Sequence, residues 1–139
     1  MRLDLTNLGN AVDSLEAALK ALGSCQGESF SVEIRETIKA GVVQNFEISY
    51  EMGWKFMKRW ITGKLGTAAL EGLSRKELFR LAGENGFIDN VEGWILFHHL
   101  RNQTTHTYSS DRADEVLDAS PNLLSACRKL YQVIAKDND

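Results

Sequence analysis

The residues of this chain that are best suited to chemistry lie together in one short stretch, HHLRNQTTHTYSS at positions 98–110. The stretch holds all three histidines of the chain, His98, His99 and His106, together with Arg101 and Asn102. Histidine exchanges protons near neutral pH, and arginine binds phosphate through two parallel hydrogen bonds. The stretch contains no pair of carboxylates that would hold magnesium. These residue types suit metal-independent cleavage of RNA, in which histidine assists attack by the 2′-hydroxyl and arginine stabilises the charge on the phosphate.

Helix geometry limits how these side chains can meet. If residues 91–106 form a helix, each residue turns by about 100°, so His98, Asn102 and His106 lie on one face. Arg101 lies next to that face, but it precedes His106 by five residues, and the two Cβ atoms point about 140° apart. The two side chains can meet if the arginine reaches round, if the helix loosens before His106, or if they come from two copies of the chain across a dimer axis.

Plainer explanations fit the same residues. Basic side chains at the end of a helix stabilise its dipole, and the residue types alone favour this explanation over a reaction site. His98 and His106 are eight residues apart and form a poor metal pair, because the ligands that zinc would need beside them are lacking. We therefore expect no metal site and no cofactor. His99 is expected to be a surface or interface residue.

A second set of candidate residues lies on a long segment near the middle of the chain. The aromatic residues Phe46, Tyr50 and Trp54 recur at helical spacing, which is typical of a core stripe. On another face Glu47, Glu51 and Lys55 follow one another every four residues, which is typical of a solvated face but also makes them candidates for a cleft or substrate-binding surface. A small basic group ends the segment and would either stabilise the helix end or bind phosphate. Its members are Lys55, Lys58, Arg59 and Lys64.

The elements that must position these residues are all predicted to be helices. Apolar residues spaced by three and four predict a first helix from about Leu5 to Gly23. A second helix is expected over residues 32–61, and capping signals at Ser74 and Asp89 predict a third helix and a fourth that reaches the histidine stretch.

The last part of the chain is predicted to hold two more helices. Asp111 is expected to cap a short fifth helix, and Ser120 followed by Pro121 is expected to begin a separate last helix. No stretch alternates polar and apolar residues as a half-buried strand does. The predicted fold is therefore all-α, an antiparallel, up-and-down helical bundle of four main helices plus one or two short ones, in a single domain over residues 1–139.

Composition narrows the class of protein. The chain has 139 residues and a net charge of −3, so it lacks the bulk basic charge of many nucleic-acid-binding proteins. Its two cysteines, Cys25 and Cys127, are expected to be free thiols in a reducing compartment. No apolar stretch approaches the length of about 20 residues that spans a bilayer, and the first residues lack the pattern of a signal peptide. The sequence predicts a cytoplasmic protein without a membrane segment.

Two motifs resemble those of a known family. The pattern R-N-x-x-x-H-x-Y resembles the signature of HEPN domains, and F-E-x-x-Y-E-x-x-W-K resembles a hallmark of the nucleotidyltransferase substrate-binding branch, the toxins of HEPN–MNT toxin–antitoxin pairs. The first is formed by Arg101, Asn102, His106 and Tyr108, and the second by Phe46, Glu47, Tyr50, Glu51, Trp54 and Lys55. The resemblance covers nearly the whole chain.

The resemblance implies more than the residues alone. It implies a helical bundle that forms a homodimer, with the two R-N-x-x-x-H motifs facing one another in a composite ribonuclease site. Arg101, Asn102 and His106 would be its catalytic residues. The implied partner is a small nucleotidyltransferase, and the implied acceptor of AMP from that enzyme is Tyr108. Bulky negative charge two residues after His106 would block the cleft and repel RNA.

Two hypotheses follow. The first is a dimeric toxin that cuts RNA, and it rests on the intact R-N-x-x-x-H-x-Y stretch. The second is a non-catalytic subunit that binds a nucleotide or substrate for the transferase, and it rests on the Glu47–Lys55 helix and the net acidity. In either case His98, Glu47, Glu51 and Lys55 are candidates for residues of the cleft.

Overall fold

The structure is a computed structural model that describes residues 2–27, 29–106 and 110–137, with the side chains of residues 104–106, 110 and 111 not included. All regular elements in these ranges are helices, as the sequence predicts. They are α1 (Thr6–Ser24), α2 (Val32–Leu65), a 3₁₀ turn η1 (Thr67–Leu70), α3 (Arg75–Glu84), α4 (Val91–His106) and α5 (Ser110–Asp137).

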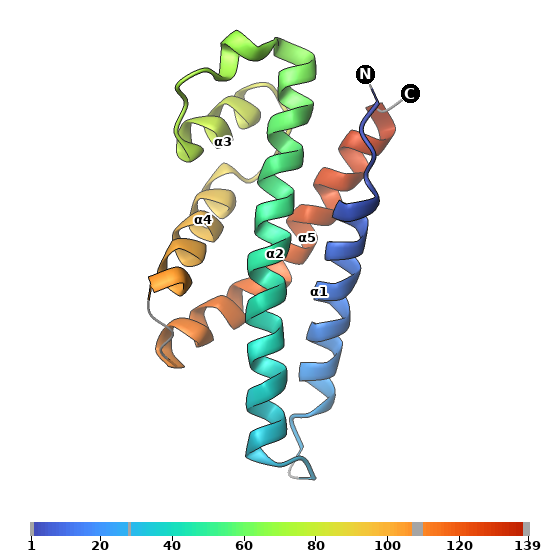
Figure 1. Ribbon diagram of the computed structural model, residues 1–139, viewed down its shortest axis with the longest axis vertical. Coiled ribbons are helices and arrows are strands. Elements are labelled where there is room, and N and C mark those ends of the chain that lie inside the picture. Colours follow the sequence, from blue (N-terminus) through green and yellow to red (C-terminus); the bar gives the residue numbers. More distant parts are fainter. Residues whose placement is uncertain (1, 28, 107–109, 138–139) are drawn as a thin grey trace.

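Three long helices carry most of the core. α1 and α2 run antiparallel, and α5 crosses behind them, so that the two termini lie at the same end of the molecule (Figure 1). α3 and α4 lie on the other side of α2 from α1 (Figure 1). The core is continuous across the helices because each contributes one apolar stripe at helical spacing. The stripe of α2, for example, buries Val42, Val43, Phe46 and Tyr50.

The C-terminal part of the chain differs from the sequence prediction. A short fifth helix and a separate last helix were expected, but the structure has one helix, α5, with Pro121 inside it. A proline removes one backbone donor and strains the preceding turn, yet the apolar stripe continues across it without a change of spacing. The buried positions of that stripe are Ala113, Val116, Ser120, Leu123, Cys127, Leu130 and Ile134. Burial on both sides of the proline therefore keeps the helix in one piece.

The ends of α3 and α4 are set by local capping. Ser74 and Glu77 form the capping box that the sequence predicts, with Glu77 N–H donating to the Ser74 hydroxyl at 3.2 Å and Ser74 N–H donating to the Glu77 carboxylate at 3.1 Å. At α4 the cap differs from the expected Asp89. The side chain of Asn90 accepts from Gly93 N–H at 3.0 Å, so α4 begins one residue later than a cap at Asp89 would place it.

A glycine sets the distance between α2 and α4. A Cβ atom on Gly53 would lie 2.8 Å from the Trp94 ring and 3.3 Å from the Cys127 sulfur. The Trp94 ring is itself held among Tyr50, Phe79 and other aromatic rings, at centroid distances of 6.3 and 5.7 Å from these two. Gly53 therefore lets the indole pack directly against the α2 backbone, and α4 takes its position from this contact.

Both cysteines are buried free thiols. Burial raises the pKa of the Cys127 thiol to about 12, which leaves it protonated and inert near neutral pH. None of the helices in the described ranges is both long enough and apolar enough to cross a membrane.

Candidate functional site

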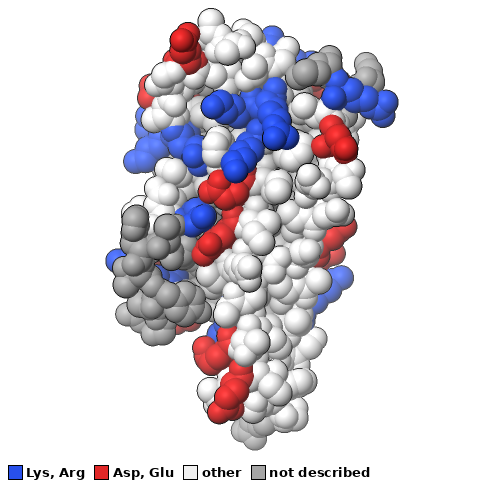
Figure 2. All heavy atoms as spheres, viewed as in Figure 1, with Lys and Arg blue, Asp and Glu red and all other residues white. Residues whose placement is uncertain are grey.

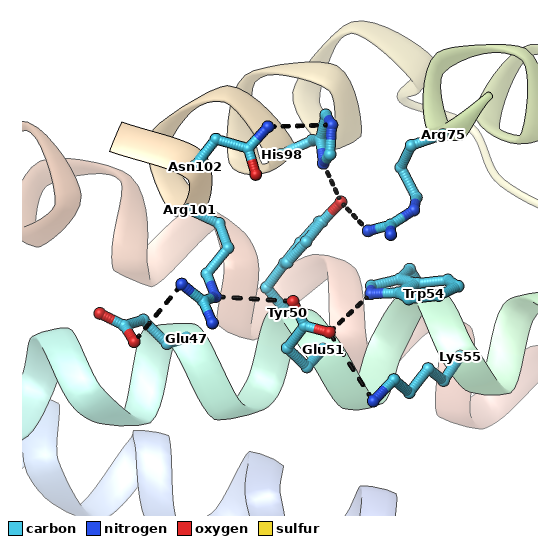
Figure 3. Close-up of polar contacts among 9 residues, drawn as sticks. All are labelled: Glu47, Tyr50, Glu51, Trp54, Lys55, Arg75, His98, Arg101 and Asn102. Carbon is cyan, nitrogen blue, oxygen red and sulfur yellow. Dashed lines mark hydrogen bonds and ion pairs between the residues drawn. The ribbon is translucent and has the colours of Figure 1, made fainter. Parts of the chain in front are cut away.

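A chain of hydrogen bonds joins three helices around the buried hydroxyl of Tyr50 (Figure 3). Nη1 of Arg75, at the start of α3, donates to the hydroxyl oxygen at 3.0 Å. The same oxygen lies 2.8 Å from Nδ1 of His98 on α4, and Nε2 of that ring lies 3.3 Å from the side-chain amide of Asn102 one turn later. Burial raises the pKa of Tyr50 to about 12, whereas burial together with the nearby charges of Arg75 and Lys76 lowers the pKa of His98. Both rings are therefore neutral near pH 7.

Two arrangements of hydrogen atoms fit these distances. In the first, the Asn102 amide nitrogen donates to Nε2 of His98, and Nδ1–H donates to Tyr50. The Tyr50 hydroxyl then accepts twice, and its own hydrogen has no acceptor among the described groups. In the second, Tyr50 donates to Nδ1, and Nε2–H donates to the amide oxygen of Asn102. Because an unpaired buried donor costs about 1–3 kcal/mol, the second arrangement is favoured, and it turns the Asn102 NH₂ group away from His98.

A group of ion pairs adjoins this chain of hydrogen bonds. The guanidinium of Arg101 lies 3.7 Å from a carboxylate oxygen of Glu47 and 3.5 Å from one of Glu51 (Figure 3). The other oxygen of Glu51 accepts from the Trp54 indole N–H at 3.0 Å and lies 3.8 Å from the Lys55 ammonium. The side chains of Arg101, Glu47 and Glu51 keep only 24, 30 and 32% of their exposure. Glu47 and Glu51 therefore form half-buried ion pairs that orient Arg101, and they do not simply belong to a solvated face.

The structure brings several of the sequence-predicted residues together. Asn102 contacts His98 one helical turn away, as a spacing of four predicts. Arg101 points from α4 to α2 and meets Glu47 and Glu51 there (Figure 3). The backbone of His106 belongs to the last turn of α4. The side chain of His106 and the whole of Tyr108 lie outside the described residues.

Some members of this cluster were not recognised as functional candidates from the sequence. The spacing of Tyr50 and Trp54 predicts core aromatics, and Tyr50 is fully buried, but its hydroxyl is the junction of the hydrogen-bond chain. Arg75 gave no signal, because it is the residue after an N-cap and its neighbours are remote in the sequence. In the structure its guanidinium lies 3.4 Å from the centroid of the Trp54 ring, a cation–π contact.

The arrangement is suited to binding an anion, but two carboxylates in it oppose that binding. Arg101 and Asn102 provide hydrogen-bond donors of the kind that phosphate oxygens accept, and the neutral imidazole of His98 holds Asn102 in place. Glu47 and Glu51 fix the direction of the Arg101 side chain, but they also compete with a phosphate for it. An anion that binds here must displace or share these carboxylates.

The all-α fold and the polar cluster between α2 and α4 can now be compared with those of known proteins. A family model described as nucleotidyltransferase substrate binding protein like matches residues 3–136. The chain belongs to this family, the nucleotidyltransferase substrate-binding branch of the HEPN superfamily, which confirms the resemblance of its two motifs.

Individual relatives agree with this assignment. The chain is 29% identical over 140 residues to a protein of Haemophilus influenzae named probable ribonuclease HepT, and the match covers 94% of this chain and 96% of that protein. A solved structure from Haemophilus influenzae, described as the fold of a substrate-binding domain of a nucleotidyltransferase, superposes with a TM-score of 0.86 and 26% identity over 95% of this chain and 99% of the other. A structure from Thermus thermophilus has a TM-score of 0.62 and 24% identity, covers 86% of this chain and 98% of its own, and supports the fold alone.

Proposed function

We propose that this protein is a metal-independent endoribonuclease that acts as a homodimer and is partnered by a small nucleotidyltransferase. The observation that carries the proposal is the position of Arg101 and Asn102. They project from the last turns of α4 into a half-buried polar cluster, five and four residues before His106 of the same R-N-x-x-x-H motif. The relative named probable ribonuclease HepT supports the same activity for this chain.

The proposed reaction needs a base, a phosphate-binding cation and a precise orientation of the RNA. His106 would take the proton from a ribose 2′-hydroxyl, whose oxygen then attacks the adjacent phosphorus. The 5′-oxygen of the next nucleotide is displaced and takes up a proton from water. Arg101 would stabilise the added negative charge on the phosphate, and the Asn102 NH₂ group would hold a phosphate oxygen. The products are a 2′,3′-cyclic phosphate and a 5′-hydroxyl end.

The site is proposed to be complete only in the dimer. On one helix the Cβ atoms of Arg101 and His106 point about 140° apart. Arg101 is also directed to Glu47 and Glu51 of its own α2. A His106 from a second copy across a two-fold axis can approach the Arg101 side chain without this restriction.

The test is cleavage of RNA by the purified protein in EDTA. We expect fragments with 2′,3′-cyclic phosphate ends, and a loss of at least about a hundredfold in rate for His106→Ala or Arg101→Ala, in the range that removal of a general base or a charge-stabilising donor costs. His99→Ala is the matched control, because His99 is exposed one residue after His98, and it should cut like wild type. Equal cleavage by His106→Ala and wild type would exclude His106 as the base.

A second candidate function is a non-catalytic subunit that binds nucleotide or substrate for the transferase. The ion pairs of Arg101 with two carboxylates favour it, since they reduce the attraction of this cluster for a polyanion, and the chain carries a net charge of −3. The solved Haemophilus structure described as a substrate-binding domain also supports it. This candidate predicts a stable complex with the transferase and nucleotide binding, but no cleavage of RNA in any condition.

Modification of Tyr108 is proposed as the means of control. Transfer of AMP to its hydroxyl would place a bulky anion two residues after His106, where it would repel the RNA backbone. Intact mass of the protein co-expressed with its transferase should then show increments of one AMP, and Tyr108→Phe should show none. Absence of any increment in the wild-type protein would exclude this control.

A further inference from the structure

A pocket outside the proposed reaction site lies between α2, the η1–α3 connection and α4. It has a volume of about 340 Å³. Leu70, Leu73 and Leu78 contribute apolar groups to its lining, and His98 lines it as well. Because His98 also contacts Asn102, the pocket and the proposed reaction site share one imidazole. A ligand that extends from the pocket to the proposed reaction site would therefore pass along His98.

Cationic groups stand at the rim of this pocket. The guanidinium of Arg75 lies 3.4 Å from the centroid of the Trp54 ring, and its Nη1 donates to the Tyr50 hydroxyl at 3.0 Å. These two contacts fix the direction of the planar guanidinium before any ligand arrives. Lys58 follows Trp54 by one turn of α2 and is exposed. None of the described residues that line the pocket is acidic.

The charge around the pocket extends beyond its lining. Basic side chains gather on the upper part of the face that Figure 2 shows, over the C-terminal half of α2 and the adjoining helices. Lys76 lies close enough to contribute to the lowered pKa of His98, together with Arg75. The Ser74 hydroxyl also lines the pocket, where it accepts from Glu77 N–H and bonds to the Glu77 carboxylate. The chain has a net charge of −3, so this basic group is a local feature and not part of a general positive surface.

We propose that this pocket binds one nucleotide unit, with its phosphate between Arg75 and Lys58 and its base or ribose against the leucines. The volume lies in the range of about 300–1,000 Å³ that is usual for small-ligand sites. A fixed guanidinium beside a lysine suits a phosphate, which accepts several charge-assisted hydrogen bonds, and the apolar side suits a flat or partly apolar group. The nucleotide is either part of an RNA strand or a free molecule, and both present the same phosphate chemistry.

An RNA strand is the occupant that would serve the proposed function, and this part of the inference rests on that function. The shared wall at His98 would let a strand whose cleaved phosphate lies at Arg101 place a flanking nucleotide in the pocket. Lys58 and Arg75 would then add affinity without taking part in the chemical step.

The test measures binding of a labelled single-stranded RNA oligonucleotide to the full-length His106→Ala protein, in which cleavage does not interfere. Lys58→Gln and Arg75→Gln should each weaken binding by about three- to tenfold at 0.1 M salt, and each should reduce the slope of log K against log salt by about 0.7. Lys39→Gln is the matched control, because Lys39 lies on the same helix about 28 Å from Lys58 by the rise per residue. It should bind like the parent protein.

A second arm uses AMP and ATP as probes of the same variants. Weaker RNA binding alone assigns the pocket to RNA, and weaker nucleotide binding alone assigns it to a free nucleotide. If Lys58→Gln and Arg75→Gln bind all of these probes as well as Lys39→Gln does, or if the parent protein binds none, the inference is wrong. Lys58→Gln is an exposed change that leaves folding intact, so the result does not depend on Arg75→Gln alone. Loss of the proposed ribonuclease activity would appear separately, as RNA that is bound by the wild-type protein but not cut.

Discussion

The tautomer of His98 decides the direction of the hydrogen bonds in the cluster. Tyr50 accepts from Arg75 and is fully buried, so its hydroxyl is best placed to donate its hydrogen to Nδ1 of His98. In this arrangement His98 carries its hydrogen on Nε2. The Asn102 amide, whose nitrogen lies 3.3 Å from Nε2 as placed in Figure 3, then turns so that its oxygen accepts that hydrogen. The hydrogen-bond donors therefore follow one direction, from Arg75 on α3 through Tyr50 on α2 to His98 and Asn102 on α4.

The tautomer can be read by ¹⁵N NMR of labelled histidine at neutral pH. We expect His98 to show a pyridine-like Nδ1 and a protonated Nε2. Tyr50→Phe removes the donor to Nδ1 and should shift the signals toward a mixture of both tautomers, as for a histidine in water. A His98 ring with its hydrogen on Nδ1 would contradict the proposed direction of these hydrogen bonds.

The same ring gives the stability of the protein a pH dependence. Burial, followed by Arg75 and Lys76, lowers the pKa of His98 from its ordinary value of 6.5, against a smaller opposite effect of Glu51. The unfolded chain therefore binds a proton at a higher pH than the folded chain does. Its free energy of unfolding should fall as pH drops below about 6.5 toward the folded pKa, and the contribution is fully present above that window.

Urea unfolding between pH 7.5 and 5 would measure this effect. His98→Gln keeps a polar side chain without a proton to gain, so its stability should fall less over this interval than that of wild type. Parallel profiles for wild type and His98→Gln would show that His98 does not titrate differently on folding.

The sequence predicted the residues of the motif better than their surroundings. Motif spacing placed His98 and Asn102 on one face of a helix, and the structure agrees. Helical spacing cannot show which residue of a remote helix meets them, so the contacts of Arg101 with Glu47 and Glu51 and of Arg75 with Tyr50 became visible only in three dimensions. Both arginines act through long side chains, whose direction depends on packing between helices.

At the scale of the elements, the spacing of apolar residues predicted the helices better than local start and stop signals did. The apolar stripes predicted α1 and α2 nearly to their ends, and the capping box predicted the start of α3. The pair Ser120–Pro121 predicts a helix start, but Ser120 instead donates to the Val116 carbonyl at 2.7 Å inside α5. The unbroken spacing of buried residues from Val116 to Ile134 was the stronger signal, because burying a continuous stripe outweighs the loss of one backbone hydrogen bond.

The position of α4 against α2 depends on Gly53, a glycine within α2. Gly53→Ala would add a methyl group 2.8 Å from a buried Trp94 ring that other aromatic rings hold in place. A gain of about 1 kcal/mol in helix propensity is then exceeded by overpacking, which costs about 1–3 kcal/mol and often more where nothing can yield. We expect Gly53→Ala to lower the free energy of unfolding and, by displacing α4, to reduce the proposed RNA cleavage.

Gly41→Ala is the matched control for this prediction. Gly41 lies on the same helix, and a Cβ atom there would meet no other atom within 4 Å. This change should stabilise the protein by up to about 1 kcal/mol, because alanine favours the helix over glycine. Urea unfolding of the two variants, side by side, measures both. If Gly53→Ala were as stabilising as Gly41→Ala, the close approach of Trp94 would not limit the packing of α4.

At the scale of the whole molecule, the proposed site requires two chains. Ile48 on α2 and Leu96 on α4 are exposed, so the two helices offer apolar side chains to a partner. If Arg101 of one protomer works with His106 of the other, each dimer holds two sites, and each site draws one residue from each chain. The two residues can then be removed from different chains with different results.

Heterodimers purified through two different affinity tags would test this arrangement. A dimer of one Arg101→Ala chain and one His106→Ala chain keeps one intact site in the trans arrangement, so it should cut RNA at about half the wild-type rate. A dimer of one wild-type chain and one chain with both substitutions carries the same number of changes, but it has no intact site and should be inactive. If Arg101 and His106 of the same chain work together instead, the two heterodimers exchange their activities, with the first inactive and the second about half active. The pair of dimers therefore separates the two arrangements without depending on how much either substitution disturbs the fold, because each contains the same two changes.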